Sequence, residues 1–274
     1  MSRKHGVLLY ARADAARNRW FIQRLCECAE SEGMTLRLCI AEDGFHLHAP
    51  YPDFVINRSR NAAFSQMCEE TAGIPVYNSI MVTEITNDKY RTHLFLRQNG
   101  LPTADTVLIR SGDACPADYL PPLVAKPADG HGGAGVTQLS DQAALARALR
   151  EMSRPFLLQR QMQTGWDTRV YVMDGEIYAA VLRTSASDFR SNFSLGGAAS
   201  VIEPDSEMRA LVSRVQEILP LDFAGVDFLR RPDGGYVIGE IEDAVGCRML
   251  YALTGLDPAA DYIRMIARRT ERGI

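Results

Sequence analysis

The segment that decides the fold is Phe223-Ala-Gly-Val-Asp-Phe-Leu-Arg-Arg-Pro-Asp-Gly-Gly-Tyr-Val-Ile-Gly-Glu-Ile-Glu242, in which two apolar strands flank the turn signal Asp233-Gly234. If this pair forms a two-residue turn, Asp227 lies directly opposite Glu240 on one face of the hairpin. Glu242 projects from the same face because side chains alternate along a strand. The sequence therefore predicts three neighbouring carboxylates on a largely apolar hairpin.

These carboxylates are expected to need a positive partner. Adjacent carboxylates repel and raise one another's pKa unless a positive group lies between them. Mg²⁺ prefers oxygen ligands and commonly takes one or two carboxylates together with substrate phosphates. We therefore predict a metal site at Asp227, Glu240 and Glu242. The alternative is an exposed acidic face that pairs with Arg169 or Arg248.

A second motif combines a lysine with a glycine-rich turn. Lys126 ends an apolar run, and Asp129-Gly-His-Gly-Gly-Ala-Gly135 follows shortly after it. Consecutive N–H groups of such a turn can converge on phosphate oxygens, and the lysine adds a positive charge. The motif lacks the Gly-Lys-Ser/Thr of a Walker loop, and a strand follows it where a dinucleotide fingerprint has a helix. Taken alone, it is also typical of a flexible surface turn.

The first 80 residues alternate apolar strands with helical patterns. Such alternation predicts a parallel sheet covered by helices. Arg58 and Arg60 follow the strand expected at residues 53–57, at the carboxyl end where parallel sheets bind ligands. They are candidates to clamp a substrate carboxylate, with ordinary loop arginines as the alternative.

The later part of the chain changes to antiparallel signals, because Asp174-Gly175 and Asp233-Gly234 each separate two apolar strands. We therefore predict a mixed α/β and α+β protein. Its expected parts are an N-terminal parallel α/β domain at residues 1–85, a central lobe with the glycine-rich lid at 86–160, and an antiparallel α+β domain with the metal site at 161–274.

Composition narrows the class of protein. The chain has 274 residues and a formal net charge of −4, with a pI near 5.8, which offers no electrostatic basis for binding nucleic acid. No apolar run reaches the roughly 18 residues that a membrane helix needs. Six scattered cysteines without a CxxC pair are typical of reduced cysteines. We expect a cytoplasmic protein that binds neither nucleic acid nor membranes.

Seven features in a fixed order resemble the ATP-grasp superfamily, and most closely its RimK-type branch of α-L-glutamate and related amino-acid ligases. The resemblance runs from about Asp53 to the end of the chain. The features are Asn87-Asp-Lys89, Leu123-Val-Ala-Lys126-Pro, the glycines of residues 130–135, Leu157-Leu-Gln159, Gly165-Trp-Asp167-Thr-Arg169, Asp188-Phe-Arg190-Ser-Asn192 with Gly196-Gly197, and Gly225-Val-Asp227.

This resemblance implies the ATP-grasp fold, with ATP and Mg²⁺ (or Mn²⁺) held between the lobes. The implied nucleotide-binding residues are Lys89, Lys126, Gly130, Gly132, Gly133, Gly135, Arg160, Gln161, Asp167, Arg190 and Asn192. Arg183, Arg190 and Asn192 are the implied catalytic residues near the reacting centre. The implied metal ligands are Asp227, Glu240 and Glu242, in agreement with the hairpin register.

The resemblance also implies a reaction. The γ-phosphoryl group of ATP passes to a substrate carboxylate, and an amine then displaces phosphate from the acylphosphate to leave an amide. The substrates are expected to be amino-acid-like or peptides, and the protein to be a homodimer or tetramer, as relatives commonly are. The alternatives are a ligase that modifies a peptide or carrier protein, and a nucleotide-binding protein without ligase activity.

Three departures from the family pattern bear on these alternatives. The hinge has Arg160-Gln161 where the family has an acidic residue followed by an aromatic or aliphatic one. Glu242 replaces the usual asparagine of Glu-x-Asn, which adds negative charge beside the phosphates. The segment after Glu242 lacks the usual Pro-Gly ending, so the acceptor pocket is expected to differ from that of the family.

Overall fold

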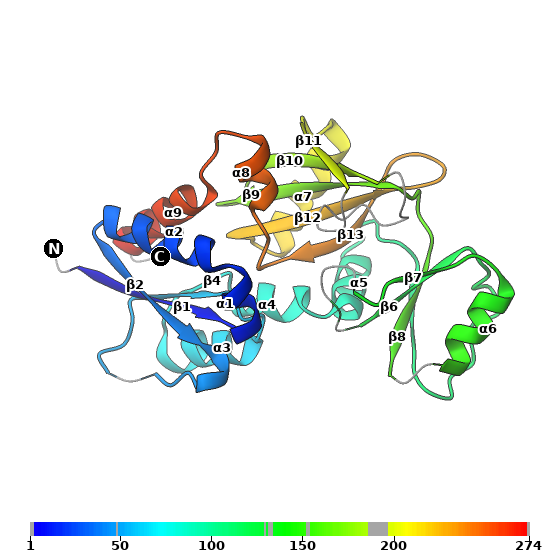
Figure 1. The fold of residues 1–274 in the computed structure, drawn as a ribbon, viewed down its shortest axis with the longest axis horizontal. Helices are drawn as coiled ribbons and strands as arrows, with labels where there is room; N and C mark the ends of the chain where they lie inside the picture. Colours follow the sequence, from blue (N-terminus) through cyan, green and yellow to red (C-terminus); the bar gives the residue numbers. More distant parts are fainter. Residues whose placement is uncertain are drawn as a thin grey trace.

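A parallel sheet in the order β2-β1-β3-β4 forms the N-terminal part of the molecule (Figure 1). The computed structural model describes residues 3–47, 49–128, 130, 134–151, 154–185 and 197–272. The elements of this part are β1 (Lys4–Tyr10), α1 (Arg12–Arg17), α2 (Arg19–Ser31), β2 (Met34–Ile40), a 3₁₀ turn (Ala41–Asp43), β3 (Phe54–Asn57), α3 (Ala62–Gln66), a π-helical turn (Met67–Thr71) and β4 (Val76–Tyr77). The predicted parallel α/β arrangement is confirmed.

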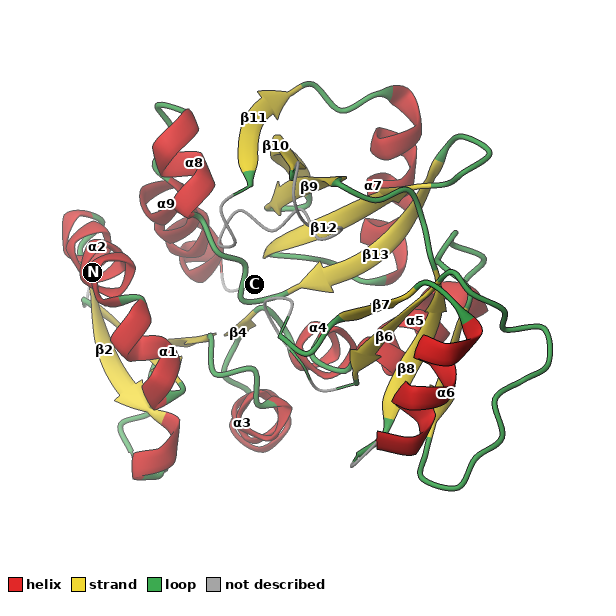
Figure 2. Cartoon of the chain, turned by 45° about the vertical axis from the view of Figure 1, so that its right-hand side comes forward, coloured by secondary structure: helices red, strands yellow, loops and turns green. Residues whose placement is uncertain are grey.

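A small antiparallel sheet in the order β5-β8-β6-β7 forms a separate lobe, and α6 lies along its outer side (Figure 2). Leu145 of α6 is buried against Leu123 and Leu158 of the sheet, which closes a core of its own for this lobe. The elements of the lobe are β5 (Thr106–Ile109), β6 (Leu123–Pro127), β7 (Thr137–Leu139), α6 (Gln142–Glu151) and β8 (Phe156–Arg160). Two helices precede it, α4 (Ile80–Thr86) and α5 (Lys89–Gln98). Val82 of α4 and Leu96 of α5 belong to the core of the C-terminal sheet.

A third sheet, antiparallel and in the order β11-β10-β9-β12-β13, carries the segment from which the fold was predicted. Its elements are β9 (Trp166–Met173), β10 (Glu176–Thr184), β11 (Ala198–Ile202), α7 (Ser206–Ile218), β12 (Phe223–Arg230), β13 (Tyr236–Glu242), α8 (Arg248–Leu253) and α9 (Pro258–Arg272). Side chains of β12 alternate between its two faces. Val226 packs with α7 on one face, and Phe223 packs with Tyr262 of α9 on the other.

The hairpin of β12 and β13 aligns Asp227 with Glu240, as predicted. The predicted two-residue turn is wrong, because Arg231, and not Pro232, pairs with Gly235 through an N–H···O bond of 3.0 Å. Proline has no N–H to donate, so the closing bond moves one residue outward. A bulge at Gly239 then shifts the register by one residue and restores the Asp227–Glu240 pair.

Close packing in the N-terminal sheet provides a test of the fold. The ring of Phe54 covers Gly6, and a Cβ added there would overlap it. Gly6→Ala is expected to lower the free energy of unfolding by about 1–3 kcal/mol, because overpacking forces side chains out of their rotamers. Urea unfolding followed by circular dichroism measures this. Gly255→Ala is the control, because nothing lies within 4 Å of its added Cβ; equal losses in both variants would contradict the packing.

The helices and the cysteines of the structure can be compared with what the composition predicts. No helix in the described part of the chain is long and apolar enough to cross a membrane. All six cysteines are free, and Cys28, Cys68 and Cys247 are buried. The cytoplasmic location and the domain boundaries at residues 85 and 160 stay predictions.

Candidate nucleotide and metal site

The two lysines predicted to bind phosphates meet at one carboxylate. Asp88 caps α5 by accepting the N–H groups of Tyr90 and Arg91, both at 2.9 Å, which fixes Lys89 in the first turn. Nζ of Lys89 lies 2.7 Å from Oε1 of Glu240. Nζ of Lys126, on β6, lies 3.8 Å from the same oxygen. The cluster joins the small lobe, α5 and β13.

This lysine cluster contains more positive than negative charge. Burial lowers the pKa of Lys126 below its ordinary value, although Glu240 offsets part of this effect. Burial also opposes ionisation of Glu240, but Lys89 and Lys126 outweigh it and lower the pKa of that carboxyl. Two ammonium groups thus face one carboxylate in a largely buried place. Such a place favours an additional anion, and phosphate oxygens fit it.

A second ionic network surrounds Asp227. Nε and Nη2 of Arg169 each lie 2.7 Å from a different oxygen of Asp227, and Nη1 of Arg169 lies 2.8 Å from Oε2 of Glu242. Arg183 donates to Asp227 at 2.8 Å and also pairs with Asp167. Burial opposes ionisation of Asp227, yet Arg169 and Arg183 hold its pKa well below the ordinary value. Strands β9, β10, β12 and β13 each supply a member of this network.

The structure brings the predicted metal ligands to one region but pairs each of them with a cation. Among the described residues, no three acidic, histidine or cysteine side chains are grouped to hold a metal ion. The predicted cluster of three carboxylates is therefore not assembled in this conformation. The alternative prediction, an exposed acidic face paired with arginine, is correct about Arg169, which pairs with Asp227 and Glu242. It is wrong about exposure, since Asp227 is only 8% exposed. The oxygen donors present still suit Mg²⁺.

The segment that leads into the predicted glycine-rich lid contacts the start of α5. The N–H of Lys89 donates to the carbonyl of Ala128 at 3.3 Å, two residues before the first glycine of the lid. Gly135 has a φ of +72°, and a Cβ there would lie 2.8 Å from Cγ of Pro127. Glycine is required at this position for both reasons. Four predicted site residues lie outside the described residues: Gly132, Gly133, Arg190 and Asn192.

The predicted adenine hinge follows β8. The N–H of Arg160 donates to the carbonyl of Asp105 at 2.9 Å, and the N–H of Gln161 donates to that of Pro122 at 3.4 Å. The guanidinium of Arg160 also pairs with Asp105 and Asp118. These two N–H groups are engaged within the lobe, so an adenine contact here would use other backbone groups of the hinge.

The two arginines after β3 differ in their surroundings. Arg60 pairs with Asp14. Arg58 is buried, with Nη2 donating to the carbonyl of Val245 at 2.8 Å and the guanidinium 5.7 Å and 5.2 Å from the ring centroids of Tyr10 and Phe21. No carboxylate of the described residues forms an ion pair with Arg58. Of the two, Arg58 therefore suits an anionic ligand better.

Sequence reasoning missed the polar group next to Glu242. Asp243 is 4% exposed and accepts a hydrogen bond on Oδ2 from Asn87 at 3.0 Å, while its Oδ1 has no partner. Asn78 anchors this segment by donating to the carbonyls of Phe223 at 2.8 Å and Asp243 at 3.0 Å. The only sequence signal was the departure from the family pattern after Glu242.

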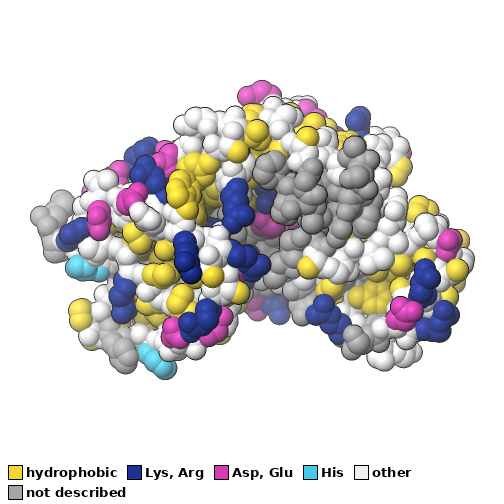
Figure 3. Space-filling model, viewed as in Figure 1, with side chains coloured by type: hydrophobic (Ala, Val, Ile, Leu, Met, Phe, Trp, Pro, Cys, Tyr) yellow, Lys and Arg dark blue, Asp and Glu magenta, His cyan; other side chains and the backbone are white. Residues whose placement is uncertain are grey.

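Two adjoining hollows lie between the N-terminal part and the C-terminal sheet. An inner cavity of about 220 Å³ is lined by Lys89, Glu240 and Asp243, and an outer pocket of about 380 Å³ lies beside it. Arg58 and Glu242 line both. The space-filling view shows Lys and Arg side chains beside the hollow on this face (Figure 3).

Comparison with known proteins identifies the family to which this chain is similar. Residues 86–266 match the RimK-like ATP-grasp domain. A probable α-L-glutamate ligase of Xanthomonas euvesicatoria pv. vesicatoria is 30% identical, with 91% of this chain and 94% of that protein covered. The glutamate–LysW ligase ArgX of Sulfurisphaera tokodaii is 27% identical over 75% of this chain and 77% of its own length.

A solved structure agrees in fold. The ATP-grasp ligase PsnB, complexed with a phosphomimetic variant of its minimal precursor, Mg and ADP, has a TM-score of 0.71 and 19% identity, with 97% of this chain and 98% of that chain covered. Its likeness supports the three-sheet arrangement described above. The chain belongs to the RimK-like ATP-grasp family and is an ATP-dependent carboxylate–amine ligase of that family.

Proposed function

We propose that the protein uses MgATP to join an amino-acid-like carboxylate to an amine, with the nucleotide phosphates at Lys89 and Lys126. The observation that carries this proposal is the position of Glu240, between both lysines and opposite Asp227. Phosphates would replace Glu240 as partner of the lysines, and the released carboxylate would be available to a metal ion. Asp227 and Glu242 would complete the ligands for Mg²⁺ or Mn²⁺.

The proposed reaction has two steps. An oxygen of the substrate carboxylate attacks the γ-phosphorus and ADP leaves, which gives an acylphosphate. The amine nitrogen then attacks the carbonyl carbon, loses a proton and expels inorganic phosphate to leave an amide. Mg²⁺, when bound, neutralises charge on the phosphate oxygens.

The protein's own side chains position and stabilise the reacting groups. Lys89 and Lys126 orient the phosphates. Arg183, held rigidly by Asp167 and Asp227, would stabilise the developing oxyanion by charge-assisted hydrogen bonds, because a fixed donor needs no reorganisation during the reaction. The glycine-rich segment 130–135 would act as a lid that keeps water from the acylphosphate.

A peptide or carrier-protein acceptor is the second candidate. One relative and one structural neighbour favour it: ArgX is named a glutamate–LysW ligase, and PsnB has been solved with a phosphomimetic variant of its minimal precursor. The two candidates share the ATP site and differ only in what enters beside it.

Release of ADP and phosphate separates the candidates. The purified protein is incubated with MgATP and with pools of free amino acids, or with short peptides. We expect ADP release that depends on an amino acid. Release with peptides alone would favour the second candidate, and nucleotide binding without turnover under every pool would contradict the proposal that free amino acids are the substrates.

A further inference from the structure

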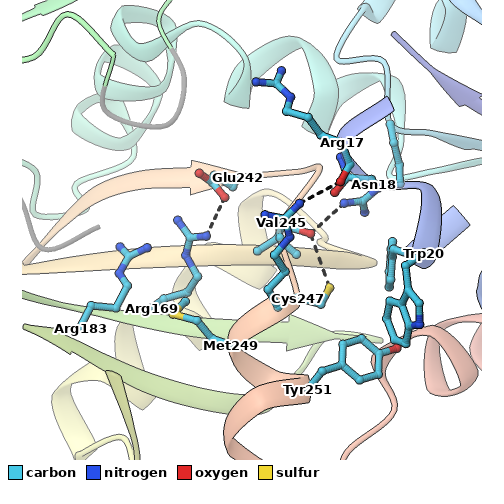
Figure 4. Close-up of a pocket in the computed structure, with 14 residues that line it drawn as sticks. Arg17, Asn18, Trp20, Arg169, Arg183, Glu242, Val245, Cys247, Met249 and Tyr251 are labelled. Atoms are coloured by element: carbon cyan, nitrogen blue, oxygen red, sulfur yellow. Dashed lines mark hydrogen bonds and ion pairs between the residues drawn. The ribbon is translucent and has the colours of Figure 1, made fainter. Parts of the chain in front are cut away.

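The outer pocket opens between the end of α1, the start of α2 and the start of α8 (Figure 4). Its volume is about 380 Å³. Arg58, Arg169 and Glu242 line both this pocket and the inner cavity that holds Lys89 and Glu240. A molecule seated in the outer pocket would therefore extend toward the proposed reacting centre. Glu242, a proposed metal ligand, and Arg183 form the inner wall of the pocket, whereas its outer part has no role in the nucleotide and metal assignments above.

Two arginines of the pocket wall already have acidic partners. Arg169 and Arg183 pair with Asp227, Asp167 and Glu242. Arg183 is also the side chain proposed above for the developing oxyanion, so neither of the two is assigned to the ligand of this pocket.

Arg58 and Arg248 are different, because no carboxylate in the described part of the chain forms an ion pair with either of them. Arg58 is 7% exposed, and its Nε has no hydrogen-bond partner. Arg248 is exposed at the opening, and its Nη2 donates to the carbonyl of Arg17 at 2.9 Å. A buried guanidinium without a counterion is costly, so the surroundings of Arg58 suit an anion, and Arg248 adds a second unpaired positive charge to the wall of the same pocket.

Part of the wall of the pocket is aromatic. The rings of Trp20 and Tyr251 meet edge to face, with centroids 4.7 Å apart and planes at 85°. Tyr251 is fixed because its hydroxyl donates to Asp257 at 2.7 Å and accepts the N–H of Ala259 at 3.1 Å. Trp20 is nevertheless 58% exposed. An exposed tryptophan that packs on a fixed tyrosine favours an apolar group of a ligand.

We propose, building on the ligase function above, that the outer pocket binds the amine substrate, and that this substrate is an amino acid or short peptide with a free carboxylate and an apolar side chain. Arg58 and Arg248 bind the carboxylate, and Trp20 with Tyr251 packs against the apolar side chain. A carboxylate held by arginines is kept from the phosphates, so this substrate reacts through its amine. Arg248 and Trp20 are then specificity-determining residues.

Intrinsic fluorescence tests this pocket without relying on turnover. The chain has two tryptophans, and Trp166 lies elsewhere, beside Arg230 at 5.5 Å. L-leucine, D-leucine, L-glutamate and L-leucinamide are titrated in the presence of Mg²⁺ and ADP. We expect one leucine enantiomer to change the emission of the wild type and to leave Trp20→Phe unchanged. Leucinamide and glutamate are expected to bind at least about tenfold more weakly, because each lacks one of the two recognised groups.

Variants at the pocket complete the test. Arg248→Ala is expected to weaken leucine binding about tenfold or more and to leave leucinamide binding unchanged. Arg209→Ala, at an exposed arginine paired with Glu203, is the control and should bind leucine like the wild type. Binding of glutamate more tightly than leucine, or leucine binding by Arg248→Ala as tight as that of the wild type, would overturn the assignment. Substrate-dependent ADP release in those variants would then show that the ligase function stands without it.

Discussion

Glu240→Gln is expected to lower kcat at least about 100-fold, which corresponds to roughly 3 kcal/mol of lost transition-state stabilisation. The substitution keeps the shape of the side chain and removes the charge that would hold a metal ion beside the transferred phosphoryl group. Nucleotide binding is expected to weaken much less, because Lys89 and Lys126 remain and lose a competing partner. ADP release and the Kd of ATP, measured on the same preparation, separate the two effects.

Glu84→Gln is a suitable control for this experiment. Glu84, on α4, forms an exposed ion pair with Arg91, on α5, and has no part in the proposed metal site. The activity of Glu84→Gln should match that of the wild type, since exposed ion pairs contribute little to stability. Full activity of Glu240→Gln would contradict the assignment of Glu240 as a metal ligand.

Asp227→Asn is expected to lower the free energy of unfolding by about 3–5 kcal/mol, because it leaves two buried arginines without their shared counterion. Arg169 and Arg183 both donate to Asp227 at distances of 2.7 and 2.8 Å. Urea unfolding at neutral pH measures the change. Glu203→Gln, which removes an exposed charge paired with Arg209, should leave the stability almost unchanged, and an equal loss in both variants would contradict the importance of the buried network.

The same network has a pH signature. The pKa of Asp227 is lower in the folded protein than in the unfolded chain, because Arg169 and Arg183 outweigh the effect of burial. Its contribution to stability is therefore present above the ordinary aspartate pKa and is lost as the pH falls below it. The stability difference between the wild type and Asp227→Asn should shrink in acid. A difference that stays constant down to the acid unfolding limit would argue against the ion pairs.

Local sequence signals predicted one element of the geometry of the site. The alternation of β12 and β13 identified Asp227 and Glu240 as cross-strand neighbours. This inference depends on residues close in sequence, for which periodicity is informative. The hairpin loop was predicted less well, and the correct pairing survived only because the bulge at Gly239 compensated for the displaced turn.

Most nonlocal pairing could not be read from sequence spacing. Arg169 was considered only as an alternative partner of the acidic face, and the pairing of Arg183 with Asp227 was not predicted, because no pattern within a single strand shows that β9 lies between β10 and β12. The contact of Asp243 with Asn87 likewise joins residues more than 150 positions apart. The contact of Trp20 with Tyr251 depends on how α2 packs near α8, which the amphipathic pattern of either helix leaves open.

A crystal structure with a non-hydrolysable ATP analogue and Mn²⁺ tests the nucleotide and metal assignment most directly, because anomalous scattering locates the metal independently of the model. We expect Mn²⁺ at ligand distance from carboxylate oxygens of Asp227 and Glu240, with the Nζ atoms of Lys89 and Lys126 on the phosphates. Manganese and phosphates bound elsewhere, with Glu240 still paired to Lys89 and Asp227 still held by Arg169, would contradict it.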